Sequence, residues 1–284
     1  MQKSLVSVIV PTFNEEKNIT RLLRSIQKQT YSPIETIIVD DQSTDATVKL
    51  AKKFKCKLFT RKHAERSVQR NFGEKKSKGE YLLFLDADMR LGTRVVQECV
   101  NKIKGSSFKA LIIPERTVGE GFLARLRDFE RQMYMGDITI EVARFFKRDI
   151  FEEFGGYDEN LTGAEDYDLP ARIMKKYKIG WGGGVIYHHE QQLTLWQLLG
   201  KKYYYASRSV LYADKHPQLI SKQGTILFRM AYLRNWKKFL RNPVLGVSFI
   251  FVRAAVTIAA VAGYIRAAGL IKFFKTLFKM FKNI

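Results

Sequence analysis

The amino-terminal half of the chain alternates short apolar runs with amphipathic segments. Residues 5–10 form a β-branched apolar run that stops at Pro11, and residues 14–29 then carry apolar side chains at helical spacing. The alternation continues with predicted strands at 35–39, 57–60 and 80–85 and predicted helices at 43–54, capped by Ser43, and 66–76. Strand and helix repeated in units of about thirty residues predict a Rossmann-like, mostly parallel twisted sheet flanked by helices.

The middle of the chain is less regular than this first half. An amphipathic stretch covers residues 122–133, and a glycine-rich patch at 180–184 precedes another apolar run. Short strands are predicted at 111–114, 143–146 and 185–187. The α/β alternation therefore gives way to mixed connections after about residue 110.

The carboxyl end contains two apolar segments of different kinds. Residues 244–263 have the length of a membrane span, but Arg253 lies near their centre, so we expect a membrane-dipping or protein-packed hairpin. In the last segment, residues 270–282, phenylalanines and leucines fill most positions outside a single helical stripe of lysines, namely Lys272, Lys275, Lys279 and Lys282. Such a helix is typical of the surface of an anionic membrane.

The charge of the chain is concentrated in the same region. Lysine and arginine outnumber aspartate and glutamate by 49 to 28, and residues 193–284 hold 16 of these basic residues with one acid, Asp214. About +15 of the net +21 therefore lies in the last third, which predicts a separate anionic partner for that part.

The composition of the chain also restricts its class. Its content of 46% hydrophobic residues excludes wholesale disorder. Cys56 and Cys99 match no disulfide or zinc spacing, and the first apolar run is too short for a signal peptide, so a cytosolic setting is expected.

Acidic residues follow the predicted strands at their carboxyl ends, where open α/β sheets bind ligands. Asp86 and Asp88 end one strand at a spacing that can share a divalent cation, although two solvated carboxylates would give the same pattern. Asp40 and Asp41 end another strand, and Asp45 is placed to cap the helix that follows. These residues predict a common acidic rim for a metal and the diphosphate that it neutralises.

A second acidic group lies further along the chain. Glu165, Asp166 and Asp168 lie within four consecutive positions, and such crowding of carboxylates suits a general base. For Asp168 we favour the simpler role of an acid in the first turn of a helix. His188 and His189 end a strand, where one imidazole either completes a metal site or serves packing and hydrogen bonding.

Taken together, these segments resemble glycosyltransferase family 2. The matching segments, in the order and rough spacing of that family, are VSVIVPTFNEE (6–16), VDDQSTD (39–45), GEYLLFLDAD (79–88), GGYDENL (155–161) and GAEDYDL (163–169). The resemblance covers roughly residues 4–215. It implies an inverting, metal-dependent enzyme with the nucleotide-diphosphosugar transferase (GT-A) fold.

The resemblance also implies a role for each matching residue. The nucleotide-sugar contacts would be Pro11, Thr12, Asn14, Glu15, Asp40, Asp41, Arg70, Asp86 and Ala87, with Asp41 at the base and Asn71 beside Arg70. Asp86, Asp88 and His188 would hold Mn²⁺ or Mg²⁺, with His188 preferred over His189. Asp166 would be the general base, and Glu165 would bind the acceptor or orient Asp166.

The chain departs from the family pattern in two places. Gln42 stands where the family usually has glycine. The shape of the turn beside the nucleotide base, and thus the identity of that base, is therefore in doubt. The QQLTLWQLL segment that begins at Gln191 contains a tryptophan but not the paired arginine of processive synthases. Transfer of a single sugar is therefore expected rather than chain synthesis.

The sequence thus predicts a catalytic region over residues 1–220 and a basic, amphipathic, helical membrane-associating region over 221–284. We expect transfer from a UDP- or GDP-sugar to a hydroxyl of a lipid-linked or membrane-proximal glycan, at the cytoplasmic face of the cell membrane, by a peripheral or monotopic protein without a nucleic-acid partner. The alternatives are a polyprenyl-phosphate glycosyl synthase, whose ionised acceptor needs no base, and a basic nucleic-acid-binding protein, which would leave the clustered acids unexplained.

Overall fold

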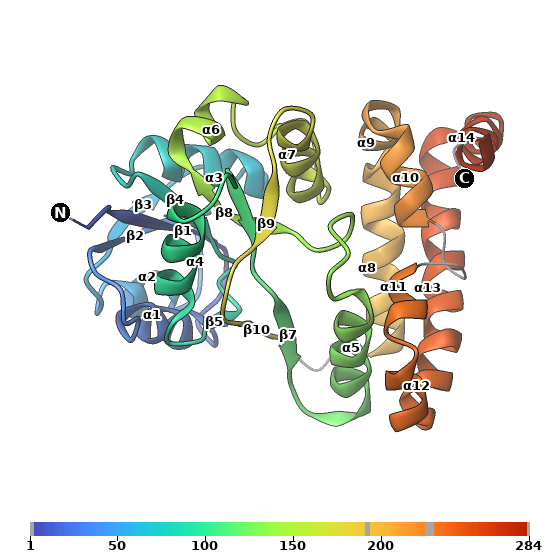
Figure 1. The fold of residues 1–284 in the computed structure, drawn as a ribbon, viewed down its shortest axis with the longest axis horizontal. Coiled ribbons are helices and arrows are strands. Elements are labelled where there is room, and N and C mark those ends of the chain that lie inside the picture. Colours follow the sequence, from blue (N-terminus) through green and yellow to red (C-terminus); the bar gives the residue numbers. More distant parts are fainter. Residues whose placement is uncertain (1–2, 191–193, 225–229, 283–284) are drawn as a thin grey trace. The chain divides into compact units, whose positions relative to one another are not determined.

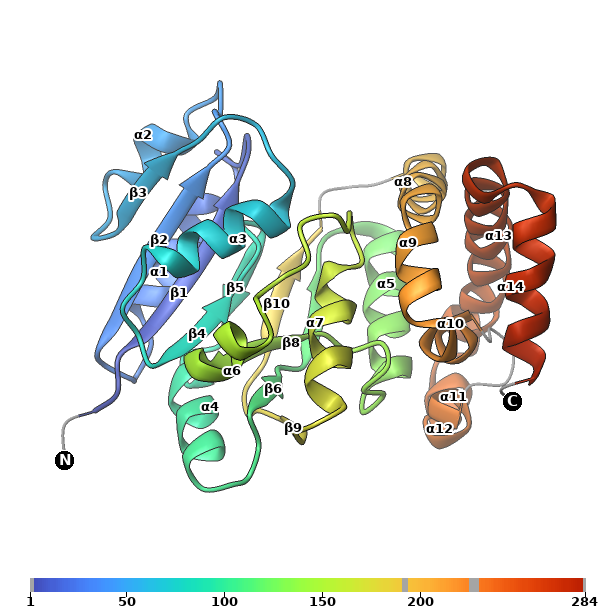
Figure 2. The same cartoon turned by 90° about the horizontal axis from the view of Figure 1, so that it is seen from above.

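The computed structural model describes residues 3–190, 194–224 and 230–282, whose elements form two compact units (Figures 1 and 2). The first unit comprises Met1–Arg116, Val142–Glu159 and Glu165–His189, and the second comprises Thr117–Glu141, Asn160–Ala164 and Glu190–Ile284. These units do not coincide with the division expected at residue 220. The assignment of catalysis and membrane association to the two sides of residue 220 stays a prediction.

A seven-stranded sheet in the order β3-β2-β1-β4-β8-β6-β9 forms the centre of the first unit. Its strands are β1 (Val6–Thr12), β2 (Ile34–Asp40), β3 (Lys57–Thr60), β4 (Tyr81–Phe84), β6 (Ala110–Ile112), β8 (Ala143–Lys147) and β9 (Ile179–Trp181). The first four run parallel, β8 is antiparallel to both of its neighbours, and β9 is parallel to β6. The α/β sheet predicted from the sequence is confirmed. It is a mixed sheet, because β8 runs antiparallel to both of its neighbours while the other pairs are parallel.

A smaller sheet has the order β5-β10-β7. Its strands are β5 (Met89–Leu91), β7 (Glu115–Val118) and β10 (Ile186–His189). Strand β10 runs antiparallel to β5, with His188 opposite Met89. This pairing brings His188 into contact with Asp88, although the two residues are 100 positions apart in sequence.

Helices cover both faces of the large sheet because the side chains of each strand alternate in direction. Val6, Val8 and Val10 join a core with side chains of α1 (Ile19–Gln27) and α4 (Val95–Lys104). Ile9 points to the opposite face, toward α3 (Arg66–Lys75). A Cβ on Gly73 would lie 2.5 Å from Cγ2 of Ile9, so only glycine lets α3 approach the sheet this closely. The first unit also contains α2 (Thr47–Ala51), α6 (Arg148–Glu153) and α7 (Glu165–Met174).

Two predicted helices are shorter than their apolar periodicity indicates. The helix expected from residue 14 begins at Ile19, because Asn14 has a left-handed backbone with φ of +54°. The helix expected over 43–54 is reduced to α2, and the Ser43 hydroxyl donates to Asp40 rather than capping it. The cap predicted at Asp45 is wrong, because the N-cap residue of α2 is Ala46, although the Asp45 carboxylate accepts from the amide of Thr47 at 2.9 Å.

The second unit consists mainly of helices, drawn from green to red in Figure 1. They are α5 (Gly121–Tyr134), α8 (Leu195–Arg208), α9 (Val210–Lys215), α10 (Pro217–Gly224), α11 (Met230–Arg234), α12 (Lys237–Arg241), α13 (Pro243–Ala268) and α14 (Leu270–Lys282). Helix α13 packs closely on α8, since a Cβ on Gly263 would lie 2.2 Å from the carbonyl oxygen of Tyr203. Its Phe249 joins Leu126, Phe129 and Met133 of α5 in a separate apolar core.

The hairpin expected within residues 244–263 is wrong. The segment belongs to α13, a single helix of 26 residues that Figure 1 draws without a break. Its glycines serve close packing rather than a turn, as at Gly263, and Arg253 is paired with Glu130 of α5 at 3.2 Å. Within the described ranges, α13 is the one helix long and apolar enough, by length and composition, to cross a membrane.

Candidate active site

The carboxyl ends of β1, β2 and β4 meet at one edge of the large sheet because these strands are parallel. Pro11 and Thr12 are buried at the end of β1. Asp40 is the last residue of β2, and Asp86 follows β4 by two residues. The sheet therefore brings together at one edge the residues that the sequence predicted for the nucleotide.

Asp40 is fully buried, and its carboxylate holds the turn that follows β2. It accepts hydrogen bonds from the Ser43 amide at 3.0 Å, the Ser43 hydroxyl at 2.6 Å and the Thr12 hydroxyl at 3.3 Å. These contacts use three acceptor positions of the Asp40 carboxylate. The role expected for Asp40 beside Asp41 or at the ribose stays a prediction.

Asp41 is also buried and is held by the segment after β3. Its Oδ1 accepts from the amide of Ala64 at 3.0 Å, and its Oδ2 lies 2.6 Å from Nδ1 of His63. The His63 side chain is 78% exposed, so one edge of its ring faces solvent while Nδ1 faces the carboxylate. His63 could not be predicted from sequence, because a lone histidine in a loop carries no motif.

Gln42 has a left-handed backbone, a conformation that favours glycine. Its φ of +59° lies in the left-handed region, which costs a non-glycine residue about 1 kcal/mol. The turn next to Asp41 is therefore a left-handed one despite the substitution. The identity of the nucleotide base stays open.

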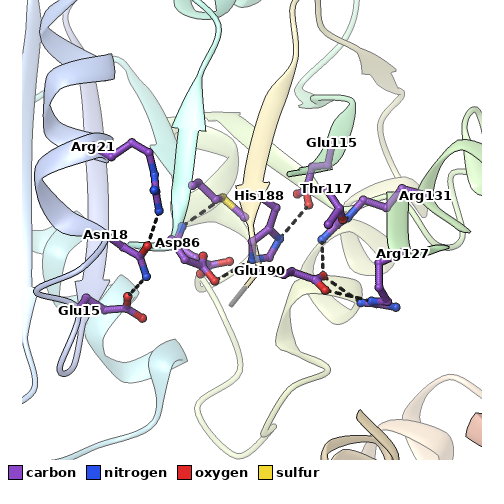
Figure 3. A network of polar contacts seen from close by, with 12 residues as sticks. Glu15, Asn18, Arg21, Asp86, Glu115, Thr117, Arg127, Arg131, His188 and Glu190 are labelled. Atoms are coloured by element: carbon purple, nitrogen blue, oxygen red, sulfur yellow. Dashed lines mark hydrogen bonds and ion pairs between the residues drawn. The ribbon is translucent and has the colours of Figure 1, made fainter. Parts of the chain in front are cut away.

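Side chains of the β2–α2 loop bind the main chain of the β1–α1 loop. The Asn14 amide donates to the Ser43 hydroxyl at 2.9 Å, and the Asn14 side chain accepts from the Thr44 amide at 2.9 Å. The Glu15 amide donates to the Thr47 hydroxyl at 2.7 Å. Figure 3 shows Glu15 beside Asn18, which in turn contacts Arg21. Asn14 thus joins the two loops, while burial raises the pKa of Glu15.

Arg70 is the centre of the most concentrated charge in the first unit. Its side chain is 0% exposed, and it donates to Asp86 through Nη2 and to Asp166 through Nη1, both at 2.6 Å. Nη1 also lies 3.3 Å from Glu165, and the guanidinium carbon lies 5.4 Å from the ring centre of Tyr157. One arginine therefore connects a predicted donor carboxylate with the predicted base.

Asn71, the residue next to Arg70, positions the segment that precedes α7. Its side-chain amide donates to the carbonyl of Tyr157 and to Glu159, each at 2.9 Å. The Tyr157 amide donates back to the Asn71 side chain at 3.0 Å. In the Arg-Asn pair of the family pattern, Arg70 thus contacts carboxylates, whereas Asn71 contacts both main chain and the Glu159 carboxylate.

Glu165 and Asp166 lie in the first turn of α7, where the sequence placed acids. Asp166 is 18% exposed and uses Oδ1 for Arg70. Glu165 is buried, and its Oε2 has no hydrogen-bond partner among the described residues. Burial, with the nearby charge of Asp166, raises the pKa of Glu165 despite Arg70. Asp168 pairs with Arg172 at 2.8 Å, which supports the helical role expected for it.

Arg144 and Glu115 extend the same network and were missed by the sequence analysis. Arg144 donates to Glu115 at 2.5 Å and lies 3.4 Å from Asp86. Burial alone would raise the pKa of Asp86, but the guanidinium groups of Arg70 and Arg144 hold that pKa well below its ordinary value. Figure 3 shows Glu115 near His188, whose Nδ1 lies 3.7 Å from its carboxylate.

Asp88 and His188 provide the donor atoms that fit a divalent cation. Nε2 of His188 lies 2.9 Å from Oδ2 of Asp88, while Oδ1 of Asp88 is buried without a hydrogen-bond partner in the part of the chain described. No group of three or more histidine, cysteine or acidic residues within that part forms a complete cation site. Asp88 and His188 are in direct contact, whereas the Asp86 carboxylate is engaged by arginines. Binding of a divalent cation by these three residues stays a prediction.

The remaining predicted positions are adjacent to these residues. Ala87 is buried between Asp86 and Asp88, and its expected role at the nucleotide stays a prediction. Burial, with the positive charges of Arg21 and Arg90, lowers the pKa of His189 to about 4, so the imidazole is neutral at pH 7. Gln191 lies outside the described residues.

A family model and a known relative each match about half of the chain. The family model described as Glycosyl transferase family 2 matches residues 7–155, more than half of the chain. The poly(ribitol-phosphate) beta-N-acetylglucosaminyltransferase TarP of Staphylococcus aureus is 29% identical over 167 residues, which cover 52% of this chain and 50% of TarP. This chain thus spans about half the length of that relative.

Two solved structures share the fold across most of the chain. Staphylococcus aureus TarS in complex with UDP-GlcNAc has a TM-score of 0.58 at 20% identity and covers 98% of this chain and 88% of that one. The mannosyltransferase PcManGT of Pyrobaculum calidifontis, in complex with GDP-Man and Mn²⁺, has a TM-score of 0.65 at 18% identity, with coverage of 93% and 88%. At these identities the likeness establishes the GT-A fold.

Proposed function

Because this chain belongs to glycosyl transferase family 2, we propose that it transfers a single sugar from a nucleotide diphosphosugar to a hydroxyl of a lipid-linked or membrane-proximal glycan, with inversion. The observation that carries the proposal is the buried contact of Arg70 with Asp86 on one side and Asp166 on the other. A single guanidinium thereby fixes the carboxylate expected at the donor relative to the carboxylate expected at the acceptor.

The donor would occupy the edge formed by the β1–α1 and β2–α2 loops and Asp86. Thr12, Asp40 and the left-handed turn at Gln42 hold Asp41 in place for the base, and Asn14 and Glu15 order the adjacent loop. The structures of TarS with UDP-GlcNAc and of PcManGT with GDP-Man contain donors of this kind. A UDP- or GDP-sugar is therefore the class of donor that we propose.

Asp88 and His188, with Asp86 nearby, would hold Mn²⁺ or Mg²⁺. Such a cation, when bound, neutralises the charge that develops on a diphosphate leaving group. Glu115 lies 3.7 Å from Nδ1 of His188 and would orient the imidazole so that Nε2 faces the cation. The complex of PcManGT with Mn²⁺ supports this choice of metal.

Asp166 would accept the proton of the acceptor hydroxyl as that oxygen attacks the anomeric carbon. Its Oδ1 is held by Arg70, which leaves Oδ2 for the acceptor on a partly exposed side chain. Glu165 stands next to it with a raised pKa and an unpartnered Oε2, which suits a hydrogen bond to the same acceptor.

A binding screen with an Asp88→Asn variant tests the donor and metal assignments. We expect a UDP- or GDP-sugar with Mn²⁺ to stabilise the wild-type protein against heat, because a ligand that binds only the folded state stabilises it by mass action. Asp88→Asn should lose the Mn²⁺-dependent part of the shift, and Asn101→Ala in the exposed part of α4 should retain it. Equal stabilisation of Asp88→Asn and wild type by Mn²⁺ would contradict the assignment.

Membrane association is the second part of the proposal and rests on α13 and α14. The exposed apolar residues there are Val244, Val247, Ile250, Phe251, Ile258, Leu270, Ile271, Phe274 and Phe278. On α14, Phe274 and Phe278 share the exposed surface with Lys275 and Lys279, whereas Lys272 pairs with Asp214 at 2.7 Å. The lysine stripe predicted from the sequence is thus interleaved with exposed apolar residues, and the side chain of Lys282 lies outside the described part.

A surface of this kind suits the interface of an anionic membrane, with phenylalanines in the lipid and lysines at the headgroups. We therefore propose a peripheral or monotopic protein at the cytoplasmic face of the cell membrane. The 26-residue length of α13 and its exposed apolar positions support contact with lipid along that helix as well.

Vesicle binding tests this second part. Lys275→Gln combined with Lys279→Gln should weaken binding to vesicles of 30% phosphatidylglycerol and 70% phosphatidylcholine by about thirtyfold, from about 1 kcal/mol for each lysine. Lys52→Gln combined with Lys53→Gln removes two exposed charges from the first unit and should leave binding unchanged. Sedimentation with vesicles gives both values, and equal losses in the two pairs would refute the role of α14.

A further inference from the structure

A cluster of charged side chains lies among three helices of the second unit and has no part in the proposed transfer. Helix α5 contributes Arg127, Glu130 and Arg131, α8 contributes Lys202, and α13 contributes Arg253. Glu190, from the segment before α8, completes it. We call these six residues the basic cluster. Figure 3 shows part of it, with Arg127 and Arg131 next to Glu190.

The two acids of the basic cluster are shared among its cations. Glu130 accepts from Arg127, from Arg253 at 3.2 Å and from the Tyr134 hydroxyl at 2.9 Å. Glu190 accepts from Arg127 through Nε and Nη2, both at 3.2 Å, and also lies 3.7 Å from Arg131. Two carboxylates thus pair with three guanidinium groups, and Lys202 adds a fourth cation to the cluster.

The cluster carries an excess of positive charge in a partly desolvated place. The side chains of Arg127, Glu130, Glu190 and Arg253 are between 13% and 20% exposed, and Lys202 is half-buried. Four cations face two acids, and they still outnumber the acids when the neighbouring Asp128 is counted. An uncompensated charge is costly to desolvate, so an ion-pair network that served stability alone would be expected to balance.

Two further observations point to a missing anion. Nε of Arg253 is buried and has no hydrogen-bond acceptor among the described residues. Burial, together with the positive charges of Arg127 and Arg253, lowers the pKa of Lys202 to about 8, although Glu130 acts in the opposite direction. Both groups would gain from an added acceptor that carries negative charge.

Phosphate oxygens are the acceptors that best match convergent arginine and lysine side chains. We infer that the basic cluster is a binding site for a phosphate group, recognised by Arg127, Lys202 and Arg253. This site goes beyond the proposed function, because neither the donor nor the base assigned above involves it. The group could be carried by a lipid headgroup or by a soluble phosphate compound, and the same three cations would bind either.

The side chains around the cluster are consistent with such a ligand. The partial exposure of Arg127 and Arg131, at 20% and 23%, leaves an approach from solvent. Thr117 accepts from Nε of Arg131 at 2.8 Å, which directs that guanidinium toward Glu190. The α8 and α13 backbones are in close contact at Gly263, so Lys202 and Arg253 project from two helices that are fixed against each other.

The test compares Lys202→Met with Lys201→Met, which removes an exposed charge from the neighbouring position of the same helix. Binding of inorganic pyrophosphate is measured by calorimetry in EDTA, so that no divalent cation supports binding at Asp88. We expect Lys202→Met to weaken pyrophosphate binding by about tenfold to a hundredfold, as the loss of a charge-assisted hydrogen bond predicts. Lys201→Met should bind like the wild-type protein, and Lys202→Arg should retain most of the affinity.

A second measurement distinguishes the two sources of phosphate. The same variants are sedimented with vesicles of 30% phosphatidylglycerol in phosphatidylcholine. A loss specific to Lys202→Met in the pyrophosphate experiment indicates a soluble phosphate compound, and one confined to the vesicles indicates a lipid headgroup. If Lys202→Met and Lys201→Met behave alike in both experiments, the inference is overturned. Circular dichroism of each variant verifies that the helices are intact.

Discussion

Replacing Arg70 with methionine should lower the free energy of unfolding by about 3–5 kcal/mol, the largest effect on stability that we expect from one substitution in the first unit. The reason is that Arg70 is fully buried and contacts Asp86, Asp166 and Glu165. Its removal leaves three carboxylates close together without their shared cation. Urea denaturation measures the change, and Arg94→Met, which breaks an exposed pair with Glu98, should cost less than about 1 kcal/mol.

The loss should depend on pH in a defined direction. The folded-state pKa of Asp86 is lowered, so the stability that this pair contributes is present above the unfolded pKa of about 3.9 and is lost as the pH falls below it. Arg70→Met removes the cation that lowers this pKa most. The variant should therefore lose less stability than the wild type between about pH 5 and pH 3. Parallel pH profiles for the two proteins would contradict the role of Arg70.

Asp166→Asn should lower kcat by about two to four orders of magnitude while leaving donor binding close to normal. Asparagine retains an oxygen for Nη1 of Arg70, now 2.6 Å from Oδ1, so the local structure should be preserved while the proton acceptor is lost. Steady-state kinetics with a hydroxyl acceptor, together with calorimetric binding of the donor, measures the two effects separately.

The matched control is Asp168→Asn, two residues further along the same helix, where the carboxylate pairs with Arg172. That change should reduce stability and leave kcat per folded molecule within a few-fold of the wild type. Near-normal kcat in Asp166→Asn would refute a general base at this position. It would favour an acceptor that is already ionised, such as a polyprenyl phosphate.

Most strands of the first unit could be predicted from local sequence. β1, β2 and β4 are β-branched or aromatic runs bounded by polar residues, and the structure places them within one or two residues of the expected limits. The start of α1 could not be predicted in this way. Its apolar spacing continues back toward Asn14, but the amides of residues 14–16 bind side chains 29 to 32 residues away.

The acidic residues of the site could be predicted because short motifs contain them. Arg144, Glu115 and His63 could not, because each acquires its role from a partner 22 to 58 residues away in sequence. Sheet pairing creates these contacts: β8 lies next to β4, which puts Arg144 beside Asp86. A basic or acidic residue on a short irregular strand gives no local signal of such a partner.

The hairpin predicted in residues 244–263 failed for a similar reason. Arg253 was judged unfavourable inside an apolar helix, but its partner Glu130 precedes it by 123 residues and is invisible to local patterns. The same pair explains how an arginine is tolerated in the middle of α13: the guanidinium is directed at α5 instead of at the outer apolar face.

The hydrogen bonds between the β1–α1 and β2–α2 loops have a consequence for the order of events in donor recognition. Each loop is fixed by side chains of the other, so the edge of the sheet at which we propose that the nucleotide base binds is preorganised before any nucleotide arrives. Little conformational entropy then has to be lost on binding, and the affinity for the base is determined by fit to a rigid surface. Discrimination between nucleotides should accordingly occur at the first encounter, without a closing movement of these loops.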